Sequence, residues 1–271
     1  MDKGRVAAGR IRIGIGGWTY EPWRGSFYPA GLAQRRELEH ASRRLTSIEI
    51  NGTYYGAQKP ESFRKWHDET PEDFVFSLKA PRYATNRKVL AEAGETIARF
   101  LSGGVMLLGD KLGPINWQFM ATKTFEPDDF RAFLKLLPAA AAAGGRALRH
   151  VVEVRHQSFR TPVFTEMLRE HGVAAVVAAD GKYPQIADPT APFVYVRIMG
   201  TSAEKALGYA PAALDLWAER VRIWAAGGLP EGLEHVGPNP VSGPRDVYLY
   251  VIGGHKAHNP QAAMALIERL G

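Results

Sequence analysis

Eight short apolar runs alternate with longer amphipathic segments from one end of the 271-residue chain to the other. Short runs rich in β-branched and aromatic residues predict strands, and apolar residues spaced three or four apart predict helices. The runs that predict strands are Ile11–Ile15, Ser47–Ile50, Phe74–Lys79, Pro114–Phe119, His150–Val154, Ala174–Ala179, Phe193–Ile198 and Val247–Val251. The predicted helices are Arg36–Arg44, Glu61–Glu69, Glu95–Leu108, Asp128–Leu137, Pro162–His171, Ala212–Ala226 and Pro260–Leu270.

This alternation predicts an α/β chain folded as a (β/α)8 TIM barrel, with an open doubly wound sheet as the second choice. No linker separates regions of different composition, so residues 1–271 are expected to form a single domain, with residues 1–10 as a tail. Gly181–Pro192 is too short and too rich in proline for a full helix. Gly227–Arg245 predicts a long loop before the last strand, on the face opposite the carboxyl ends of the strands.

The composition excludes several classes of chemistry. The chain has no cysteine, so disulfides, cysteine-bound zinc and cysteine nucleophiles are all excluded. No apolar run is long enough for a transmembrane helix and no signal peptide is evident, so a cytoplasmic protein without a membrane partner is expected. The net charge of +6 favours anionic ligands, whether small molecules or nucleic acid, although no basic block marks a nucleic-acid tail.

Polar residues stand among the apolar residues of the predicted strands. In the run Ile48-Glu49-Ile50-Asn51 the isoleucines belong on the helix side, because residues two apart in a strand share a face. The same parity turns polar residues of other strands toward the barrel axis. At the carboxyl ends of strands, where barrel enzymes carry their active sites, it is expected to gather Trp18, Glu49, Asn51, Lys79, Gln118, Glu153, Arg155, Asp180 and Arg197.

Three acids and three bases buried near one axis must either pair with each other or hold a ligand. As a ligand pocket, the cluster offers Glu49, Lys79, Glu153, His156 and Asp180 as candidate catalytic residues. His156 is the candidate general acid or base because an imidazole titrates near neutrality. Tyr54 is one of several loop aromatics whose flat faces suit sugars or nucleobases. The structural alternative is a layer of ion pairs that only fixes the register of the barrel.

Two glycines follow the last predicted strand and precede the helix that begins near Pro260. Loops after the seventh and eighth strands of a barrel often bind phosphate at a helix N-terminus. Gly253, Gly254 and Lys256 are therefore candidate ligand-binding residues, and a flexible turn is the alternative. The sequence contains no P-loop, and Gly14-x-Gly16-Gly17 lacks the third glycine of a dinucleotide fingerprint.

The eight histidines are dispersed and no HExxH motif occurs, so no metal ligands are predicted. A divalent cation held by Glu153, His156 and Asp180 is the alternative. The absence of a GxSxG motif disfavours a serine hydrolase. No cofactor is predicted.

Seven blocks of sequence, in order along nearly the whole chain, resemble the YecE-like family, a group of TIM-barrel proteins of unknown function. The blocks are Ile11–Tyr20, Trp23–Pro29, Ile48–Tyr55, Pro71–Pro81, Gly109–Gln118, Glu153–His156 and Phe193–Gly200. The resemblance implies the barrel fold but no reaction or substrate. It also carries over Trp18, Glu49, Asn51, Lys79, Gln118, Glu153, Arg155, His156 and Arg197, with Asp180 at the family's sixth strand.

The resemblance weakens toward the carboxyl end of the chain. Met199 stands where members of the family tend to have histidine, and Val251–Lys256 replaces a polar stretch of Asn and Asp. Gly227–Arg245 looks like an insertion relative to the family. These departures put in doubt any metal or hydrogen-bonding role at the seventh and eighth strands.

Three hypotheses about function follow. The first is an enzyme of the hydrolase or isomerase/lyase type that acts on an anionic, phosphorylated or carboxylated, sugar-like molecule. In it Arg155, Arg197 and Lys256 hold the anion, and Glu153 or Glu49 works as a base with His156. The second is nucleic-acid binding with metal-dependent phosphodiester hydrolysis, and the third is a non-catalytic binding barrel. Lys79 as a Schiff-base amine is a variant of the first. The sequence predicts no oligomeric state.

Overall fold

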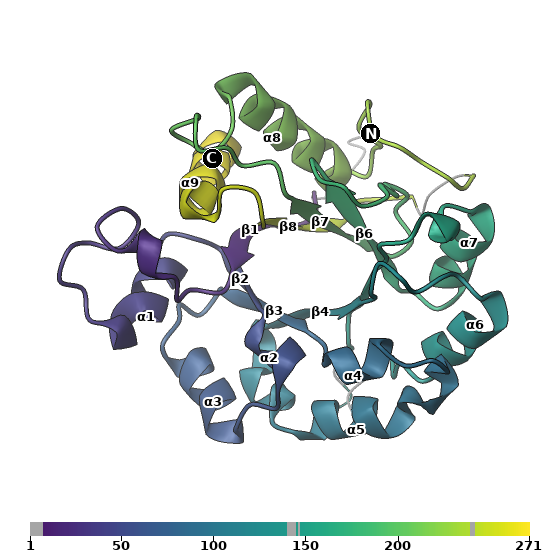
Figure 1. Cartoon of the computed structure of the whole chain (residues 1–271). Helices are drawn as coiled ribbons and strands as arrows, with labels where there is room; N and C mark the ends of the chain where they lie inside the picture. The colour runs from purple at the N-terminus through teal and green to yellow at the C-terminus, as the bar shows by residue number, and fades with distance from the viewer. Residues whose placement is uncertain (1–7, 140–144, 146, 239–241) are drawn as a thin grey trace, which may run out of the picture.

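The strands close into a barrel in which all eight are parallel and follow one another in sequence order, with β8 paired to β1. The structure is a computed structural model that describes residues 8–139, 145, 147–238 and 242–271. Figure 1 looks into the ring of strands and shows the helices arranged around it. The predicted (β/α)8 TIM barrel is confirmed, and the doubly wound sheet is excluded because an open sheet has two unpaired edges.

The strands lie within two residues of their predicted positions. Each of the eight apolar runs forms a strand of the barrel, and side chains alternate between its two faces with a period of two residues. The strands are β1 Ile11–Gly16, β2 Ser47–Ile50, β3 Val75–Lys79, β4 Leu112–Gln118, β5 His150–Glu153, β6 Ala174–Ala179, β7 Phe193–Ile198 and β8 Asp246–Val251.

The helices cover the outside of this barrel, and two short ones, α2 and α4, directly follow strands. They are α1 Glu37–Ser42, α2 Gly52–Tyr55, α3 Pro60–Asp68, α4 Arg82–Thr85, α5 Gly94–Ser102, α6 Pro127–Lys135, α7 Pro162–Glu170, α8 Pro211–Ala225 and α9 Asn259–Leu270. The single helix predicted over Glu95–Leu108 was wrong. Gly104 adopts φ of 108°, which ends α5, and the chain continues as a 3₁₀ helix over Val105–Lys111.

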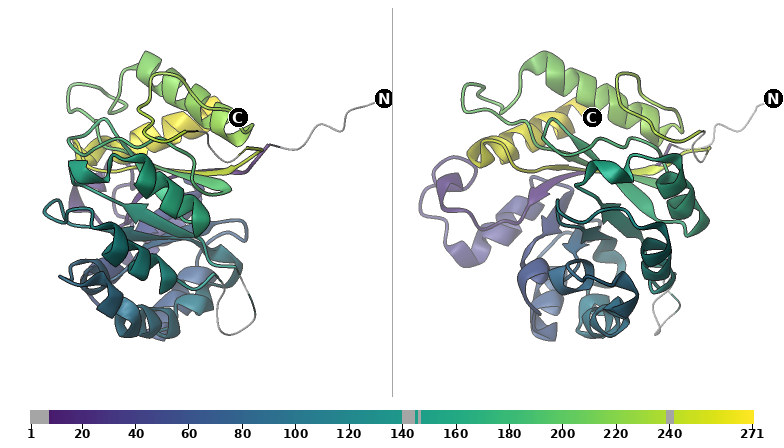
Figure 2. Two further views of the ribbon diagram at one scale, coloured as in Figure 1. Left: turned by 90° about the vertical axis from the view of Figure 1, so that its right-hand side faces the viewer. Right: turned by 45° about the vertical axis from the view of Figure 1, so that its right-hand side comes forward.

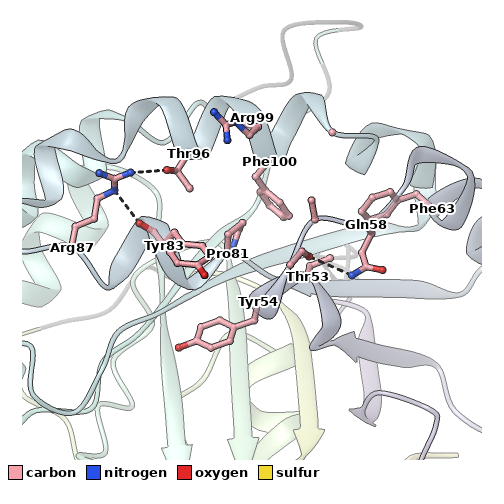
Figure 3. A pocket seen from close by; sticks show the side chains of 13 residues that line it. Thr53, Tyr54, Gln58, Phe63, Pro81, Tyr83, Arg87, Thr96, Arg99 and Phe100 are labelled. Carbon is pink, nitrogen blue, oxygen red and sulfur yellow. Dashed lines mark hydrogen bonds between the residues drawn. The ribbon is translucent and has the colours of Figure 1, made fainter.

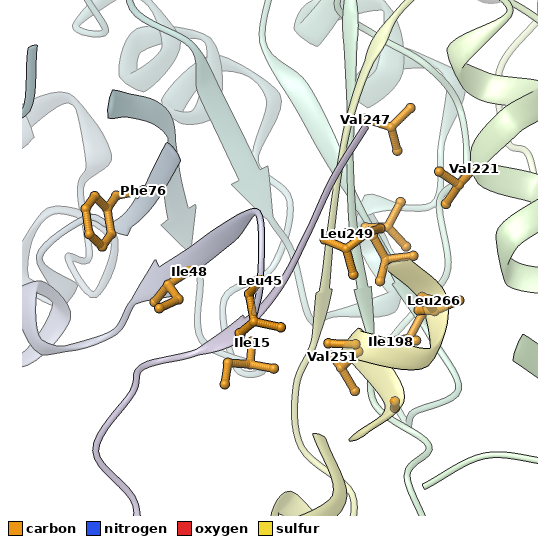
Figure 4. Packing of buried hydrophobic residues seen from close by; sticks show 14 of the residues in the cluster. Ile15, Leu45, Ile48, Phe76, Ile198, Val221, Val247, Leu249, Val251 and Leu266 are labelled. Atoms are coloured by element: carbon orange, nitrogen blue, oxygen red, sulfur yellow. The ribbon is translucent and has the colours of Figure 1, made fainter. Parts of the chain in front are cut away.

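Two clusters of buried apolar residues, each made of outward strand residues and helix residues, hold the helices to the barrel. Ile15, Ile48 and Phe76 leave their strands on the outer side and are at most 1% exposed. Figure 4 shows this packing for Val221 of α8 and Leu266 of α9, which face the strands at the end of the chain. Figure 2 shows α8 and α9 side by side along one flank of the barrel. Because successive residues of a strand point to opposite faces, the residues between these buried outer ones must point into the lumen.

The lumen is filled by side chains in layers, as in other barrels. Tyr195 and Tyr250 lie across its middle with ring centroids 5.1 Å apart, and their hydroxyls bond to Ser77 (2.8 Å) and Ser47 (2.7 Å). Gly14 leaves room for this layer, since a Cβ there would come within 3.2 Å of the Tyr250 ring. The charged residues lie above the tyrosines, at the carboxyl ends of the strands.

No helix joins β6 to β7, as predicted for Gly181–Pro192, all of which the structure describes. Part of the loop 227–245 covers the wall there instead. Asp188 accepts hydrogen bonds from the backbone N–H groups of Val236 (2.9 Å) and Gly237 (2.8 Å). Residues 234–237 thus lie along the wall beside the β6–β7 connection, and the placement of the whole loop on the face opposite the carboxyl ends stays a prediction. Residues 239–241 lie outside the described residues.

The predicted tail, residues 1–10, is described only from residue 8 onward. The Gly9 N–H donates to the Ala225 carbonyl (2.9 Å) and the Arg10 N–H donates to Asp246 (2.8 Å). The last residues of the predicted tail are therefore held against α8 and the start of β8.

Candidate functional site

A guanidinium joins two glutamates at the centre of the barrel's carboxyl end. Arg197 of β7 donates from Nη1 to Oε2 of Glu153 on β5 (2.5 Å) and from Nη2 to Oε1 of Glu49 on β2 (3.0 Å). All three residues are at most 2% exposed. Strand parity predicted that these side chains meet, and they do. Their burial and mutual pairing also make them a structural layer that fixes how three strands are spaced.

Further polar side chains complete the shell around the two glutamates. Tyr195 donates from its hydroxyl to Oε2 of Glu49 (2.6 Å), and Asn116 donates from Nδ2 to Oε2 of Glu153 (3.2 Å). Tyr195 and Asn116 were not among the predicted site residues, although both follow the same inward parity. Asn116 alternates with the outward Ile115 and Trp117, so the signal that identified Gln118 also applied to it.

Arg155 forms the solvent side of this network. Its Nε and Nη2 donate to Oε1 of Glu153 at 2.8 and 2.7 Å, and Nη2 also donates to the Gln118 side-chain oxygen at 2.8 Å. Its side chain is 20% exposed, against 1% for Glu153. The guanidinium also lies over the ring of Tyr183, 4.3 Å from the centroid. Arg155 therefore joins the buried pairs to the mouth of the barrel.

Lys79, at the end of β3, is the cation of this group that lacks an acidic partner in contact. It is 7% exposed, and within the described part of the chain its Nζ has no hydrogen bond or ion pair. Nζ lies 4.7 Å from the ring centroid of Tyr54. Burial, reinforced by the positive charge of Arg197, lowers the pKa of Lys79 to about 8, although Glu49 and Glu153 oppose the shift.

Glu153 remains ionised at neutral pH. Burial by itself would raise its pKa, but Arg197, Arg155 and Lys79 together outweigh burial and hold the pKa at about 2. Such a carboxylate is a weak base. The two glutamates face three cations, so the group carries one positive charge in excess while Lys79 is protonated.

A hollow of about 370 Å³ lies over the ends of β1 and β2. Trp18, Asn51 and Lys256 line it, and all three were predicted ligand-binding residues. Trp18 meets the ring of Trp66 edge to face at a centroid distance of 5.4 Å. The Asn51 side-chain oxygen is buried and has no hydrogen-bond partner among the described residues. Lys256 reaches this side of the mouth with Nζ 4.2 Å from the ring centroid of Tyr20.

Asp180 does not join the cluster. It directly follows β6 with φ of 57°, and its carboxylate accepts hydrogen bonds from the Tyr209 hydroxyl and the Trp217 indole N–H, both at 3.0 Å. These partners lie in the β7–α8 loop and in α8, on the outside of the barrel. The left-handed backbone of Asp180 turns its side chain outward. Strand parity could not predict this direction, because the alternation of faces ends with the last strand residue.

His156 also points away from the glutamates. Its Nδ1 accepts from the Ser158 backbone N–H (3.2 Å) and bonds to the Ser158 hydroxyl (2.8 Å), so it caps the 3₁₀ turn Gln157–Phe159. The expected pairing of His156 with Glu153 or Glu49 is absent from these contacts. The strand ends at Glu153, and the extended period of two does not continue into the turn that holds His156.

The glycines after β8 pack against the loop after β7. A Cβ on Gly254 would lie 2.5 Å from the Thr201 carbonyl oxygen, and Gly253 accepts a hydrogen bond from the Thr201 hydroxyl (3.1 Å). Both glycines have positive φ. Their geometry is that of a tight loop. Lys256 is held at the mouth of the barrel by a hydrogen bond from the Trp23 indole N–H to its backbone carbonyl (3.0 Å).

Two features are absent from the described residues. No three side chains of His, Asp or Glu in them gather as ligands for one metal ion. None of the helices they form has the length and apolar character needed to cross a bilayer.

The comparisons with known proteins agree with the closed barrel. The family described as "Protein of unknown function DUF72" matches residues 12–271. The chain belongs to the DUF72 family. The resemblance to YecE-like proteins is thereby confirmed. The prediction that the chain belongs to a TIM-barrel family of unknown function is confirmed as well.

Relatives of known sequence or structure cover this DUF72 chain to different extents. The UPF0759 protein YecE of Escherichia coli K12 is 30% identical over 55% of this chain and 50% of its own length. The UPF0759 protein YunF of Bacillus subtilis is 34% identical over 26% of this chain and 24% of its own length. The aligned part of this chain thus spans half or less of these curated relatives.

A crystal structure of a DUF72 protein from Thermotoga maritima superposes with a TM-score of 0.72 at 20% identity. The match covers 96% of this chain and 99% of the other. A DUF72 protein from Enterococcus faecalis gives a TM-score of 0.70 at 17% identity, over 96% and 95% of the two chains. At these identities the likeness establishes the shared fold.

Proposed function

We propose that this DUF72 protein binds an anionic, sugar-like small molecule at the carboxyl mouth of its barrel and moves a proton on it with Lys79. The observation that carries the proposal is Lys79 itself. Its side chain is 7% exposed and lies in the field of Arg197, and its amine has no hydrogen-bonding partner among the described residues. A buried cation is unfavourable unless something compensates its charge. A phosphate or carboxylate group supplies that compensation.

The charge balance of the layer supports an anionic ligand. Glu49 and Glu153 are already satisfied by Arg197, Tyr195 and Arg155. Neither carboxylate is therefore available to neutralise Lys79 by direct contact. Arg155, with its partly exposed guanidinium, lies on the same side of the layer and adds a second donor group toward the mouth.

The neighbouring hollow suits the body of a sugar. Asn51 directly follows Ile50, which pairs with Leu78, so Asn51 and Lys79 leave adjacent strands at the same level. Trp18 offers an aromatic face, and the buried Asn51 oxygen offers an unused acceptor for a ligand hydroxyl. These features support a polyol body between the aromatic wall and the cationic end.

The acid–base chemistry centres on Lys79 in place of the glutamates. Glu153, with a pKa of about 2, binds protons too weakly to act as a base at neutral pH. Lys79, with a pKa of about 8, exists near neutrality as an ammonium in equilibrium with an appreciable amount of amine. The amine takes a proton from the ligand and the ammonium returns it to another atom, so the step is balanced without a further reactant. This assignment favours an isomerase or lyase type of reaction over a hydrolase.

The test is calorimetric titration of the protein with glucose 6-phosphate, inorganic phosphate and glucose. We expect both phosphate-bearing probes to bind and glucose to bind more weakly. Lys79→Met should weaken the binding of the phosphorylated probe by about tenfold or more, the loss expected for one charge-assisted hydrogen bond. Lys135→Met is the matched control, because Lys135 is an exposed lysine at the end of α6.

The outcomes separate the remaining hypotheses. Unchanged binding in Lys79→Met, or no binding of either phosphate-bearing probe, would overturn the proposal. Binding of an oligonucleotide with steep salt dependence, in the absence of binding to glucose 6-phosphate, would favour the nucleic-acid hypothesis instead. Binding without proton exchange from the ligand in deuterated water would leave a non-catalytic binding barrel. Borohydride trapping with a phosphorylated ketose tests Lys79 as a Schiff-base amine.

A further inference from the structure

A cavity of about 400 Å³ lies between α2, α4 and α5, apart from the site described above (Figure 3). We propose that it is a second binding site, for a small amphipathic carboxylate with an aromatic or medium-chain aliphatic body. Its volume lies within the range of small-molecule sites in proteins. The inference does not depend on the reaction proposed for Lys79.

The floor of the cavity is apolar. Phe63 of α3 and Phe100 of α5 line it together with Pro81, which follows β3. Phe63 is 2% exposed, so it forms a fixed wall that also belongs to the outer core. Figure 3 shows Phe100 extending from α5 toward Pro81. Apolar surface of this kind gains free energy when an apolar ligand removes it from water.

A fixed cation stands at the rim of this apolar space. Arg87 donates from Nη2 to the Thr96 hydroxyl (2.9 Å) and from Nε to the Tyr83 carbonyl (2.9 Å), and Figure 3 shows the Thr96 bond spanning from the α4 side to α5. These two bonds orient the guanidinium, and Nη1 makes no hydrogen bond within the part of the chain that the structure describes, so it can bind a ligand. Within the described residues, Arg87 has no ion pair with a carboxylate.

The charges around the cavity favour an anion. Its lining contains two arginines, Arg87 and Arg99, and no aspartate or glutamate. Arg99 is bound to Glu95 (2.7 Å) on the surface of α5, so of these two arginines Arg87 is the one without an acidic partner among the described residues. A carboxylate fits a guanidinium because it accepts hydrogen bonds from it directly. An apolar body behind that carboxylate then covers the phenylalanine floor.

Tyr54 places this cavity next to the mouth of the barrel without merging the two. The tyrosine lines the cavity, and Lys79 Nζ lies over the tyrosine ring at 4.7 Å from its centroid. Gln58 lines both this cavity and the hollow beside Asn51. A ligand in the cavity therefore contacts a residue that covers Lys79, but it occupies a space of its own.

The experiment is calorimetric titration with octanoate, using octylamine and acetate as comparison probes. Octanoate should bind with measurable heat, octylamine should bind more weakly because its charge is reversed, and acetate should bind more weakly because it has no apolar body. Arg87→Met should reduce octanoate affinity by about tenfold or more. Arg64→Met is the matched control, since Arg64 is an exposed arginine of α3 outside the cavity lining.

A second variant makes the test independent of the stability of Arg87→Met. Ala57 is exposed and lines the cavity, so Ala57→Trp fills the space from a loop and should abolish octanoate binding with the fold intact. Equal binding of octylamine and octanoate, or wild-type affinity in folded Arg87→Met or Ala57→Trp, would overturn the inference. Lys79→Met should keep its octanoate affinity, which distinguishes failure of this site from failure of the proposed function.

Discussion

Replacing Arg197 with methionine should destabilise the barrel by about 3 to 5 kcal/mol at pH 7, because it leaves two buried carboxylates without their shared partner. The pKa of Glu153 gives an independent measure of this loss. It falls from 4.5 to about 2 in the folded protein, which corresponds to stabilisation on the order of 3 kcal/mol at neutral pH. Arg197 is the strongest of the charges that lower this pKa.

The assay is urea unfolding followed by circular dichroism at several pH values between 7 and 3.5. A carboxyl group with a lowered folded-state pKa contributes its full stabilisation above its unfolded pKa, near 4.5, and loses it as the pH falls toward 2. The wild type should therefore lose stability below pH 4.5 more steeply than Arg197→Met, and the gap between them should narrow. Glu153→Gln combined with Arg197→Met should be less destabilised than Arg197→Met alone. A loss below about 1 kcal/mol at pH 7, or a gap independent of pH, would refute the reasoning.

Three other perturbations test the assignments residue by residue. Because the pKa of Lys79 is about 8, glucose 6-phosphate affinity should fall between pH 7 and pH 9 in calorimetry, and a flat profile would contradict a role for its charge. Asp180→Ala should lower the free energy of unfolding in urea by about 2 kcal/mol, because the hydrogen bonds from Tyr209 and Trp217 are lost. Its glucose 6-phosphate affinity should stay unchanged, and weaker binding would show that Asp180 belongs to the binding site. Gly254→Ala should lower stability by about 1 to 3 kcal/mol in thermal melts, because a Cβ at φ of 56° meets the neighbouring main chain, and an unchanged melting temperature would show that the loop can shift.

Strand parity was a reliable guide inside the strands. Glu49, Glu153 and Arg197 were placed in one layer from the alternation of their neighbours, and the structure joins them directly. The reason is local, because a parallel strand covered by helices on one face leaves only one direction for its polar residues. The alternation left open whether these charges pair with each other or hold a ligand, because that depends on how closely opposite walls of the lumen approach.

The same reasoning failed where a strand had already ended. Asp180 takes a left-handed conformation and His156 begins a 3₁₀ turn, so neither continues the alternation that the sequence suggested. The helix predicted over Glu95–Leu108 ended early for a similar reason, at a glycine whose backbone leaves the helical region. A single residue with an unusual φ redirects every side chain after it.

The sequence by itself determined the order of the elements and the inward side of each strand, because these follow from the spacing of apolar residues over a few positions. The tertiary structure alone decided which charges pair, since Arg197 finds its partners 44 and 148 positions away in the chain. It also decided that Lys79 has no acidic partner in contact among the described residues, and that a cavity opens between α2, α4 and α5. Pairing, burial and pKa depend on distances through space, and only the closure of the barrel sets those distances.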